Sequence, residues 1–425
     1  MTENYNKFEK LMSLFLTKFP RAKKTVKKIY QYLNYCIYKK NYSHYTSYVL
    51  KKFSLENKET FFGYYDKSPI NRTGALIIFH ASNISTMLLP DPHKPVDLII
   101  FNNFKNSVVS TFTSYAYNWQ QGTKCQWIDD NRLIYNDYDT LNNRYISKIV
   151  DVQNSDIIKK IDYPIYDVFG DIAISLNFDR LAKLRPDYGY RNRLKFSEVD
   201  LNDLENDGIF KIDLQKNTQS LLISLKRIIH TEHKENMVNA QHKVNHIMIS
   251  PKGDKFIFLH RYFVKGRKFD RLMLSDLDGY ALRVLANDDM VSHCCWFDNS
   301  TIISYMRNFR IGDKYYLIDI DKGEIKILGK NIIDTFGDGH PNIYNDLLLF
   351  DTYPNKSRMR GLYLFNLSSH KVDKLGDFFE AFRYYGETRC DLHPRWTHDG
   401  KQIFFDAVFE GKRHLYMLTL GDKNV

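Results

Sequence analysis

The chain contains little cysteine and no long apolar segment. Its five cysteines are odd in number and show no CxxC spacing, so neither a disulfide framework nor a structural zinc site is expected. They are Cys36, Cys125, Cys294, Cys295 and Cys390. No run of about 18 apolar residues could span a bilayer, and no N-terminal stretch combines an apolar core with a small-residue cleavage site. We therefore expect a cytoplasmic protein.

Excess positive charge is almost absent outside the N-terminus. The formal net charge is +11, but residues 1–52 hold twelve Lys or Arg and two Glu, a balance of +10 that leaves +1 for the rest. Because phosphate binding needs a basic face on the domain that binds, we expect no nucleic-acid partner. The chain also lacks a phosphate loop of the Walker or dinucleotide-binding kind, although this does not exclude sugar nucleotides.

Residues 1–52 form a basic extension with apolar residues at helical spacing. Pro20 separates two such stretches. They consist of Tyr5, Phe8, Leu11, Met12, Phe15 and Phe19, and of Val26, Ile29, Leu33 and Ile37. Lysines 23, 24, 27 and 28 crowd the start of the second helix, which is unfavourable for its dipole. The extension either attaches to an anionic membrane surface or forms a solvated helical hairpin packed on the domain.

The rest of the chain, residues 53–425, repeats a polar turn followed by an apolar strand. The turns fall at NRTG (71–74), IDDN (128–131), LNFD (176–179), SPKG (250–253), FDNS (297–300), IYND (343–346) and THDG (397–400). Period-2 alternation and aromatic enrichment predict an all-β fold, a seven-bladed β-propeller. The last copy ends one strand short, so residues near 45–62 are expected to supply it. A long polar insertion (about 184–207) interrupts the third blade.

Four histidines occupy the same place in four consecutive repeats. They are His246, His293, His340 and His393, spaced by 47, 47 and 53 residues. Because the innermost strand of each blade lines the central channel, we expect the four imidazoles to converge. One histidine at such a place is more often a turn cap or a channel filler, but four of 14 in register favour a function. Lys67, Lys124 and Asp171 occupy the corresponding position in the first three repeats, so we expect them to lie around the channel with the four histidines.

The second strand of each blade runs back to the same face. It is expected to deliver His80, Asp137, His260, Arg261, Arg307, Asp351 and Asp406 there. Imidazoles, arginines and carboxylates together predict a pocket rather than a packed core. Arg261 and Arg307 either act in this pocket or form structural ion pairs with Asp351 and Asp406, and the sequence leaves both interpretations open.

Histidines that converge with a carboxylate suit a borderline divalent cation such as manganese, iron or zinc. Asp391 lies two residues before His393, so both side chains project from one face of an extended strand. We therefore predict a metal site at His293, His340, Asp391 and His393. His246 is then free to act as a base near neutral pH.

Three segments carry a family resemblance: VNHIMISPKGDKFIFLHR, MVSHCCWFDNSTIISYM and DLHPRWTHDGKQIFFDAVFEGKRHLYML. With DGIFKIDLQKNTQSLLISL before them, they resemble the bacterial oligogalacturonate lyases, which are seven-bladed propellers, over residues 200–420. The resemblance implies cytoplasmic β-elimination of short uronic-acid oligomers, with a manganese ion held by histidines and a glutamine. It implies that His246 is the reacting histidine and that His293 and His393 bind the metal.

The chain departs from the family pattern in the last blade. The segment TRCDLHP requires Asp391 to replace one histidine, and Thr388 or Cys390 to replace the glutamine. The family's reacting arginine has three candidate counterparts, Arg227, Arg261 and Arg307. Further substrate-binding residues are expected among Lys124, Arg227, His260, Asp351 and Asp406, and Tyr384 and Tyr385 could stack on sugars.

The leading hypothesis is thus a cytoplasmic, metal-dependent lyase that acts on an anionic oligosaccharide, with Mn2+ as the expected cofactor. An arginine would neutralise the uronate carboxylate while His246 takes the neighbouring proton. The competing hypothesis is a non-catalytic propeller that holds a protein or glycan and uses its basic extension at the membrane, as in surface-polysaccharide assembly. A sugar transferase is the third.

Overall fold

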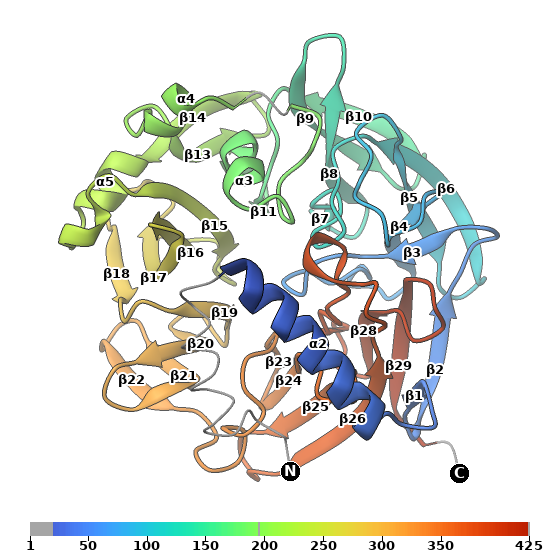
Figure 1. Cartoon of the computed structure of the whole chain (residues 1–425). Helices are drawn as coiled ribbons and strands as arrows, with labels where there is room; N and C mark the ends of the chain where they lie inside the picture. The colour runs from blue at the N-terminus through green and yellow to red at the C-terminus, as the bar shows by residue number, and fades with distance from the viewer. Residues whose placement is uncertain (1–19, 194–195, 424–425) are drawn as a thin grey trace.

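The computed structural model describes residues 20–193 and 196–423. Seven antiparallel sheets are arranged as blades around a central axis (Figure 1). The predicted seven-bladed β-propeller is therefore confirmed. The sequence produces this architecture because each repeat supplies a sheet with two apolar faces, which only neighbouring sheets can cover.

The first four blades follow the chain without exchange. Blade one contains β3 (Glu59–Phe61), β4 (Leu76–Ser82), β5 (Val96–Asn102) and β6 (Ser107–Ser114). Blade two contains β7 (Gln126–Trp127), β8 (Arg132–Asp139), β9 (Arg144–Asp151) and β10 (Asp156–Ile161). Blade three contains β11 (Asp167–Phe169), β12 (Ile172–Leu176), β13 (Gly208–Asp213) and β14 (Thr218–Ser224). Blade four contains β15 (Gln241–Ile249), β16 (Lys255–Val264), β17 (Arg267–Asp276) and β18 (Arg283–Ala286).

The remaining three blades complete the circle. Blade five contains β19 (Val291–Trp296), β20 (Thr301–Asn308), β21 (Gly312–Asp319) and β22 (Glu324–Ile327). Blade six contains β23 (Asn342–Tyr344), β24 (Leu347–Asp351), β25 (Met359–Asn366), β26 (Val372–Phe379) and β1 (His44–Tyr45). Blade seven contains β27 (Arg395–Trp396), β28 (Gln402–Ala407), β29 (His414–Lys423) and β2 (Tyr48–Phe53).

The two ends of the chain close the propeller together. Strand β2 pairs antiparallel with β29, with Leu50 opposite Leu418 and Phe53 opposite Leu415. The prediction that residues near 45–62 supply the missing strand is confirmed. Because β1 and β2 lie within the sheets, residues 44–53 belong to the propeller, and the extension ends before the predicted boundary at residue 52.

The third blade differs from the prediction. Its innermost turn lies at residues 170–171, between β11 and β12, and not at 176–179. Asn177 instead caps α3 (Phe178–Leu184), because its side chain accepts hydrogen bonds from two backbone amides of the first helical turn. Asp171 therefore lies at the opposite end of the strand. The central position belongs to Asp167, whose Oδ1 is 2.5 Å from Lys67 Nζ.

In residues 20–193 and 196–423, the helices lie in the connections between strands and before β1. Besides α3, they are α2 (Pro20–Tyr38), α4 (Glu198–Asn202), α5 (Leu225–His230), η2 (Glu235–Met237) and η3 (Gly386–Thr388). The helix predicted from Val26 to Ile37 is confirmed as part of α2. The helix predicted over residues 5–19 lies outside the described residues. No helix in the described part of the chain is both long and apolar enough to cross a membrane.

Candidate metal and active site

The four in-register histidines meet at the centre of the propeller. Ring centroids are 5.9 Å apart for His246 and His293, 4.1 Å for His293 and His340, and 4.4 Å for His340 and His393. The predicted convergence is therefore confirmed. We call these four residues the histidine row. Each comes from a different blade, so they meet only because consecutive blades are rotated about one axis.

Irregular inner strands aim these side chains into the channel. The pairing of β15 with β16 shifts register between Asn245 and Met248, around His246, and β19 shifts in the same way around His293. His246 and His393 adopt left-handed backbone conformations, with φ of 53° and 45°. Bulges and left-handed residues turn a side chain out of the strand alternation, at a cost that functional sites often carry.

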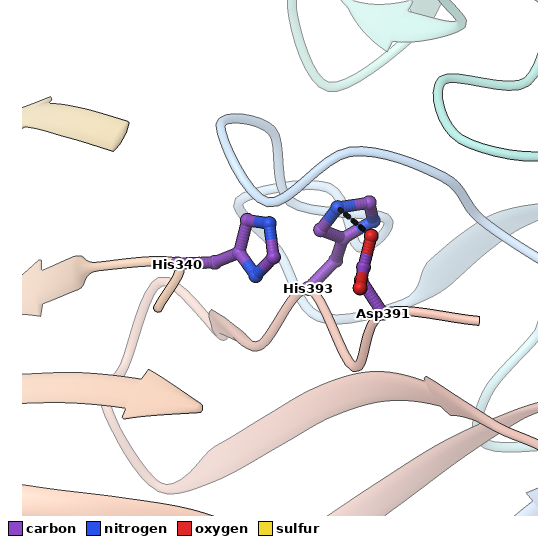
Figure 2. Close-up of side chains that lie close together, drawn as sticks. All are labelled: His340, Asp391 and His393. Atoms are coloured by element: carbon purple, nitrogen blue, oxygen red, sulfur yellow. Dashed lines mark ion pairs between the residues drawn. The ribbon is translucent and has the colours of Figure 1, made fainter. Parts of the chain in front are cut away.

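His340, Asp391 and His393 form the tightest group of ligand atoms. One ligand atom from each lies within 4.8 Å of the other two, and Figure 2 shows the two imidazoles and the carboxylate side by side. His340 Nδ1 is 2.9 Å from Asp351 Oδ1, and His393 Nδ1 is 2.9 Å from the carbonyl oxygen of Gly63. Metal-binding histidines are typically oriented by an oxygen acceptor on the second ring nitrogen.

The Nε2 of His393 is buried and has no hydrogen-bond partner among the described residues. Its protonated form is disfavoured, because burial and the neighbouring His340 hold the pKa of His393 well below its usual value. Burial would also lower the pKa of His340, but Asp351 and the other nearby carboxylates together have the larger effect and raise the pKa of His340. A divalent cation would satisfy the unpartnered nitrogen of His393, so the two imidazoles and the carboxylate fit a metal as a donor set.

Two arginines hold the Asp391 carboxylate. Arg360 Nη2 is 2.9 Å from Oδ1 and Arg389 Nε is 2.7 Å from Oδ2. Burial would raise the pKa of Asp391, but Arg389 and Arg360 hold it well below its usual value. Asp391 is therefore an ionised, fixed carboxylate, whose charge is already shared with two guanidinium groups.

A cavity of about 370 Å³ opens beside the histidine row. Its walls include His246, His293, Arg185, Arg261, Lys268 and Asp338. Three cationic side chains face one carboxylate and two imidazoles, so the cavity suits an anionic ligand. Arg185 comes from the insertion in the third blade, and Asp338 from the loop before His340, so connecting loops complete the walls.

His246 reaches the cavity as a neutral imidazole. Burial, followed by the charge of Arg261 and the neighbouring His293, holds the pKa of His246 well below its usual value. The phenol oxygen of Tyr64 lies 2.6 Å from His246 Nδ1. A neutral ring fixed in this way can accept a proton from a bound ligand.

His293 links the cavity to the metal group. Its Nδ1 is 3.0 Å from Asp338 Oδ1, and the same carboxylate accepts a hydrogen bond from Ser292. Burial lowers the pKa of His293, although Asp338 opposes this. His293 is the fourth residue of the predicted metal site, and it lies against His340 without belonging to the tightest group.

Three predicted site residues lie outside the cavity walls. The guanidinium of Arg307 forms two hydrogen bonds to Asp313, across the β20–β21 hairpin. Arg227 lies on α5, where its side chain donates to the carbonyl oxygen of Tyr280. His260 stacks on a neighbouring histidine, and its Nδ1 accepts a hydrogen bond from Arg271. The expectation that these three reach the site is wrong.

Three further residues lie near the channel but are engaged by the protein itself. Asp351 accepts hydrogen bonds from the backbone nitrogen and Nδ1 of His340. Asp406 accepts from two backbone amides, at Phe62 and Gly63. Lys124 Nζ lies 4.0 Å above the Tyr166 ring and 3.6 Å from an Asp66 oxygen. The side chains of Asp351, Asp406 and Lys124 thus have partners within the protein, and none of the three is among the residues that line the cavity.

Neither arginine forms the ion pair with Asp351 or Asp406 that the second interpretation required, whereas Arg261 lines the cavity, as the first interpretation expected. Arg261 pairs with Asp270 at 2.7 Å, and Asp406 pairs with Arg395 at 3.0 Å. Neither predicted counterpart of the family's glutamine offers a metal ligand. The Thr388 hydroxyl donates to the Tyr385 carbonyl oxygen, and burial raises the pKa of Cys390 to about 12.

Sequence reasoning missed the residues that lie outside the regular repeat. Tyr64 and Tyr65 occupy a loop between β3 and β4, and their rings lie among the four histidines. Arg185 and Tyr188 come from the third-blade insertion, and Arg389 from the loop before β27. The only available signal was that insertions into propellers tend to carry sites.

Comparison with solved structures finds the same fold in two lyases. The structure matches an oligogalacturonate lyase in complex with manganese with a TM-score of 0.57 and 15% sequence identity, covering 88% of this chain and 94% of that one. It matches an oligogalacturonate lyase from Vibrio parahaemolyticus with a TM-score of 0.55 and 12% identity, covering 89% and 98%. No protein-family model matches the sequence, and no curated protein matches it. These similarities establish the fold.

Proposed function

We propose that this protein is a metal-dependent lyase that cleaves uronic-acid-containing oligosaccharides by β-elimination. The observation that carries the proposal is the placement of neutral His246 in a cationic cavity, one histidine away from the His340–Asp391–His393 group. Two propellers of similar architecture are oligogalacturonate lyases, one of them in complex with manganese, which supports the same chemistry here.

The reaction requires a base, a carboxylate clamp and stabilisation of negative charge. The base removes the proton on the carbon beside the uronate carboxylate, and the freed electron pair forms a carbon–carbon double bond. The glycosidic oxygen leaves the next carbon with the bonding electrons and takes up a proton. In the proposal His246 takes the proton, since burial keeps its ring neutral. The negative charge of a bound uronate would favour the imidazolium formed in this step.

Arg261 and Arg185 are the candidates for binding the uronate carboxylate. Both line the cavity, and a guanidinium can hold a carboxylate through two parallel hydrogen bonds. Arg261 pairs with Asp270, and Arg185 pairs with Asp187, which fixes both side chains. A guanidinium has five N–H donors, so these pairs leave donors for a ligand.

His340, His393 and Asp391 would hold the metal, with His293 beside them. When bound, a divalent cation polarises a carboxylate oxygen and stabilises the charge that develops on it. Asp351 and the Gly63 carbonyl oxygen orient the two imidazoles, and Arg360 and Arg389 orient Asp391. The proposal includes a cytoplasmic location, which agrees with five cysteines that are all free.

The test is an elimination assay with purified protein, added Mn2+ and galacturonate oligomers, because the reaction creates an unsaturated product that absorbs in the ultraviolet. We expect absorbance to rise with wild-type protein and not with His246→Gln. Binding of the oligomers without any unsaturated product would reject the lyase and support a non-catalytic propeller. Metal-independent cleavage would reject the assignment of His340, His393 and Asp391.

A further inference from the structure

The most apolar side of helix α2 faces away from the propeller. Val26, Ile29, Leu33 and Ile37 recur at helical spacing, and their exposed fractions are 40, 56, 56 and 74%. We call these four residues the outer stripe. A helix on a soluble domain normally buries its apolar stripe, so an outward stripe indicates a second surface.

The opposite side of α2 is the side that touches the propeller. The ring of Tyr35 packs on Phe379 and Phe382, with centroids 5.7 and 5.5 Å away. Lys28 Nζ lies 4.7 Å above the ring of Tyr385. Aromatic and cation–π contacts therefore fix the rotation of the helix and leave the outer stripe uncovered by any described residue that packs on α2.

The helix lies at the cavity end of the propeller. Phe382 and Tyr385, which contact Tyr35 and Lys28 of α2, belong to a loop. This loop continues directly to Asp391 and His393. Tyr353 lines the cavity, and residues 354–356 immediately after it line a small groove together with side chains of α2. In Figure 1, α2 runs obliquely across this face, with its N-terminal end towards β15 and β19. The outer stripe and the cavity therefore belong to the same face of the molecule.

The positive charge of α2 indicates that the outer stripe fits an anionic surface. The sequence of α2, PRAKKTVKKIYQYLNYCIY, contains five basic residues and no acidic one. Residues 1–52 carry +10 of the net charge of +11. A cationic helix with an exposed apolar stripe has the composition of helices that lie in the headgroup region of anionic bilayers.

We propose that α2 docks this protein on an anionic lipid bilayer, with the outer stripe in the headgroup region and the cavity opening towards the membrane. The proposal goes beyond the proposed lyase activity and does not depend on it. For a glycan-binding cavity, this orientation selects ligands that are held at a membrane surface over ligands that diffuse freely.

Sedimentation of the full-length protein with vesicles tests the docking. We expect binding to phosphatidylcholine vesicles that contain phosphatidylglycerol, little binding to phosphatidylcholine alone, and loss of binding at high salt. The variant Ile29→Gln/Leu33→Gln/Ile37→Gln keeps every charge and should bind at least tenfold more weakly. Its matched control is Phe104→Gln, which alters a residue of 75% exposure on the β5–β6 hairpin at the other end of the propeller.

Three outcomes would overturn the docking. Unchanged vesicle binding by the triple Gln variant would show that the outer stripe is not used. Binding that survives in this variant but disappears on deletion of residues 1–19 would assign the membrane contact to that segment. A dimer that the triple variant converts to a monomer, in the absence of vesicles, would show that a second copy covers the stripe.

A second experiment tests the orientation. Cys36 is the exposed cysteine and the other four are buried, so Cys36→Ser provides a background for single labels. Phe309→Cys places a fluorophore on the β20–β21 hairpin at the cavity end, and Phe104→Cys places one at the far end. Energy transfer to a labelled lipid should be stronger from position 309. Equal or stronger transfer from position 104 would overturn the orientation.

Discussion

The phenol oxygen of Tyr64 lies 2.6 Å from Nδ1 of His246, although the two residues are 182 positions apart in the chain. Tyr64 belongs to the loop that interrupts the inner strand of the first blade. Gly63 makes the loop possible, because its φ is +123° and a Cβ there would lie 2.8 Å from the backbone carbon of Gln121. The first blade thus orients the imidazole of the fourth.

Replacing Tyr64 by Phe removes this hydrogen bond and keeps the ring. Loss of a bond of about 1.4 kcal/mol would lower kcat of the proposed elimination about tenfold, with KM little changed. Steady-state kinetics on galacturonate oligomers measure both constants. An equal loss with Tyr135→Phe, a buried tyrosine on β8 away from the histidine row, would instead indicate general destabilisation.

Removing one imidazole from the metal group should remove metal binding. We expect Mn2+ to raise the melting temperature of the wild-type protein, because a ligand that binds only the folded state stabilises it by about 2.7 kcal/mol at a hundredfold excess over Kd. His393→Ala and His340→Ala should abolish this shift, and His230→Ala, on the exposed end of α5, should retain it. Differential scanning calorimetry with and without Mn2+ measures the shift. A full shift in His393→Ala would contradict the assignment.

Charge in the cavity should decide affinity for anionic oligomers. Arg261→Met removes a guanidinium that lines the cavity, and loss of a charged hydrogen bond of 1.5–3 kcal/mol corresponds to roughly ten- to hundredfold weaker binding. Titration calorimetry with trigalacturonate measures this affinity. Arg307→Met is the matched control, because Arg307 pairs with Asp313 outside the cavity. Equal losses in both variants would place the ligand elsewhere.

The carboxylate of Asp406 should be important for stability. It pairs with Arg395, holds the amides of Phe62 and Gly63, and is almost fully buried. Asp406→Ala leaves a buried guanidinium without its partner, which typically costs about 3–5 kcal/mol. Urea denaturation measures the loss. Asp313→Ala, which breaks a half-exposed pair, should cost less than about 1 kcal/mol.

Stability should fall as the pH falls from about 6.5 to 4. Burial lowers the pKa of His80 from 6.5 to about 4, so the unfolded chain binds a proton in this range while the folded protein does not. Over this whole pH range, His80 should lower the free energy of unfolding by about 3 kcal/mol. Urea unfolding at pH 7 and pH 5 should show the decrease, and His80→Gln should show a smaller one. An identical decrease in His80→Gln would exclude this histidine as the cause.

The repeat allowed much of the architecture to be predicted from the sequence. Apolar strands that recur with polar turns can bury their faces only against one another, which predicts blades. The unfinished last repeat predicts the closing strand that β2 supplies. The turn of the third blade was predicted wrongly. The segment LNFD suits both a hairpin turn and the N-terminus of a helix, and in the structure Asn177 caps α3. Local turn chemistry could not separate the two.

The sequence by itself determined that four histidines share one repeat position, and blade rotation makes their convergence a consequence of that register. It did not determine what surrounds them. Tyr64, Arg185 and Asp338 reach the site from loops with no repeat period, and the partners of Arg307, Asp351 and Asp406 depend on side-chain distances that spacing does not encode. The tertiary structure alone decided which charged groups line the cavity, because loops from different blades bring them together.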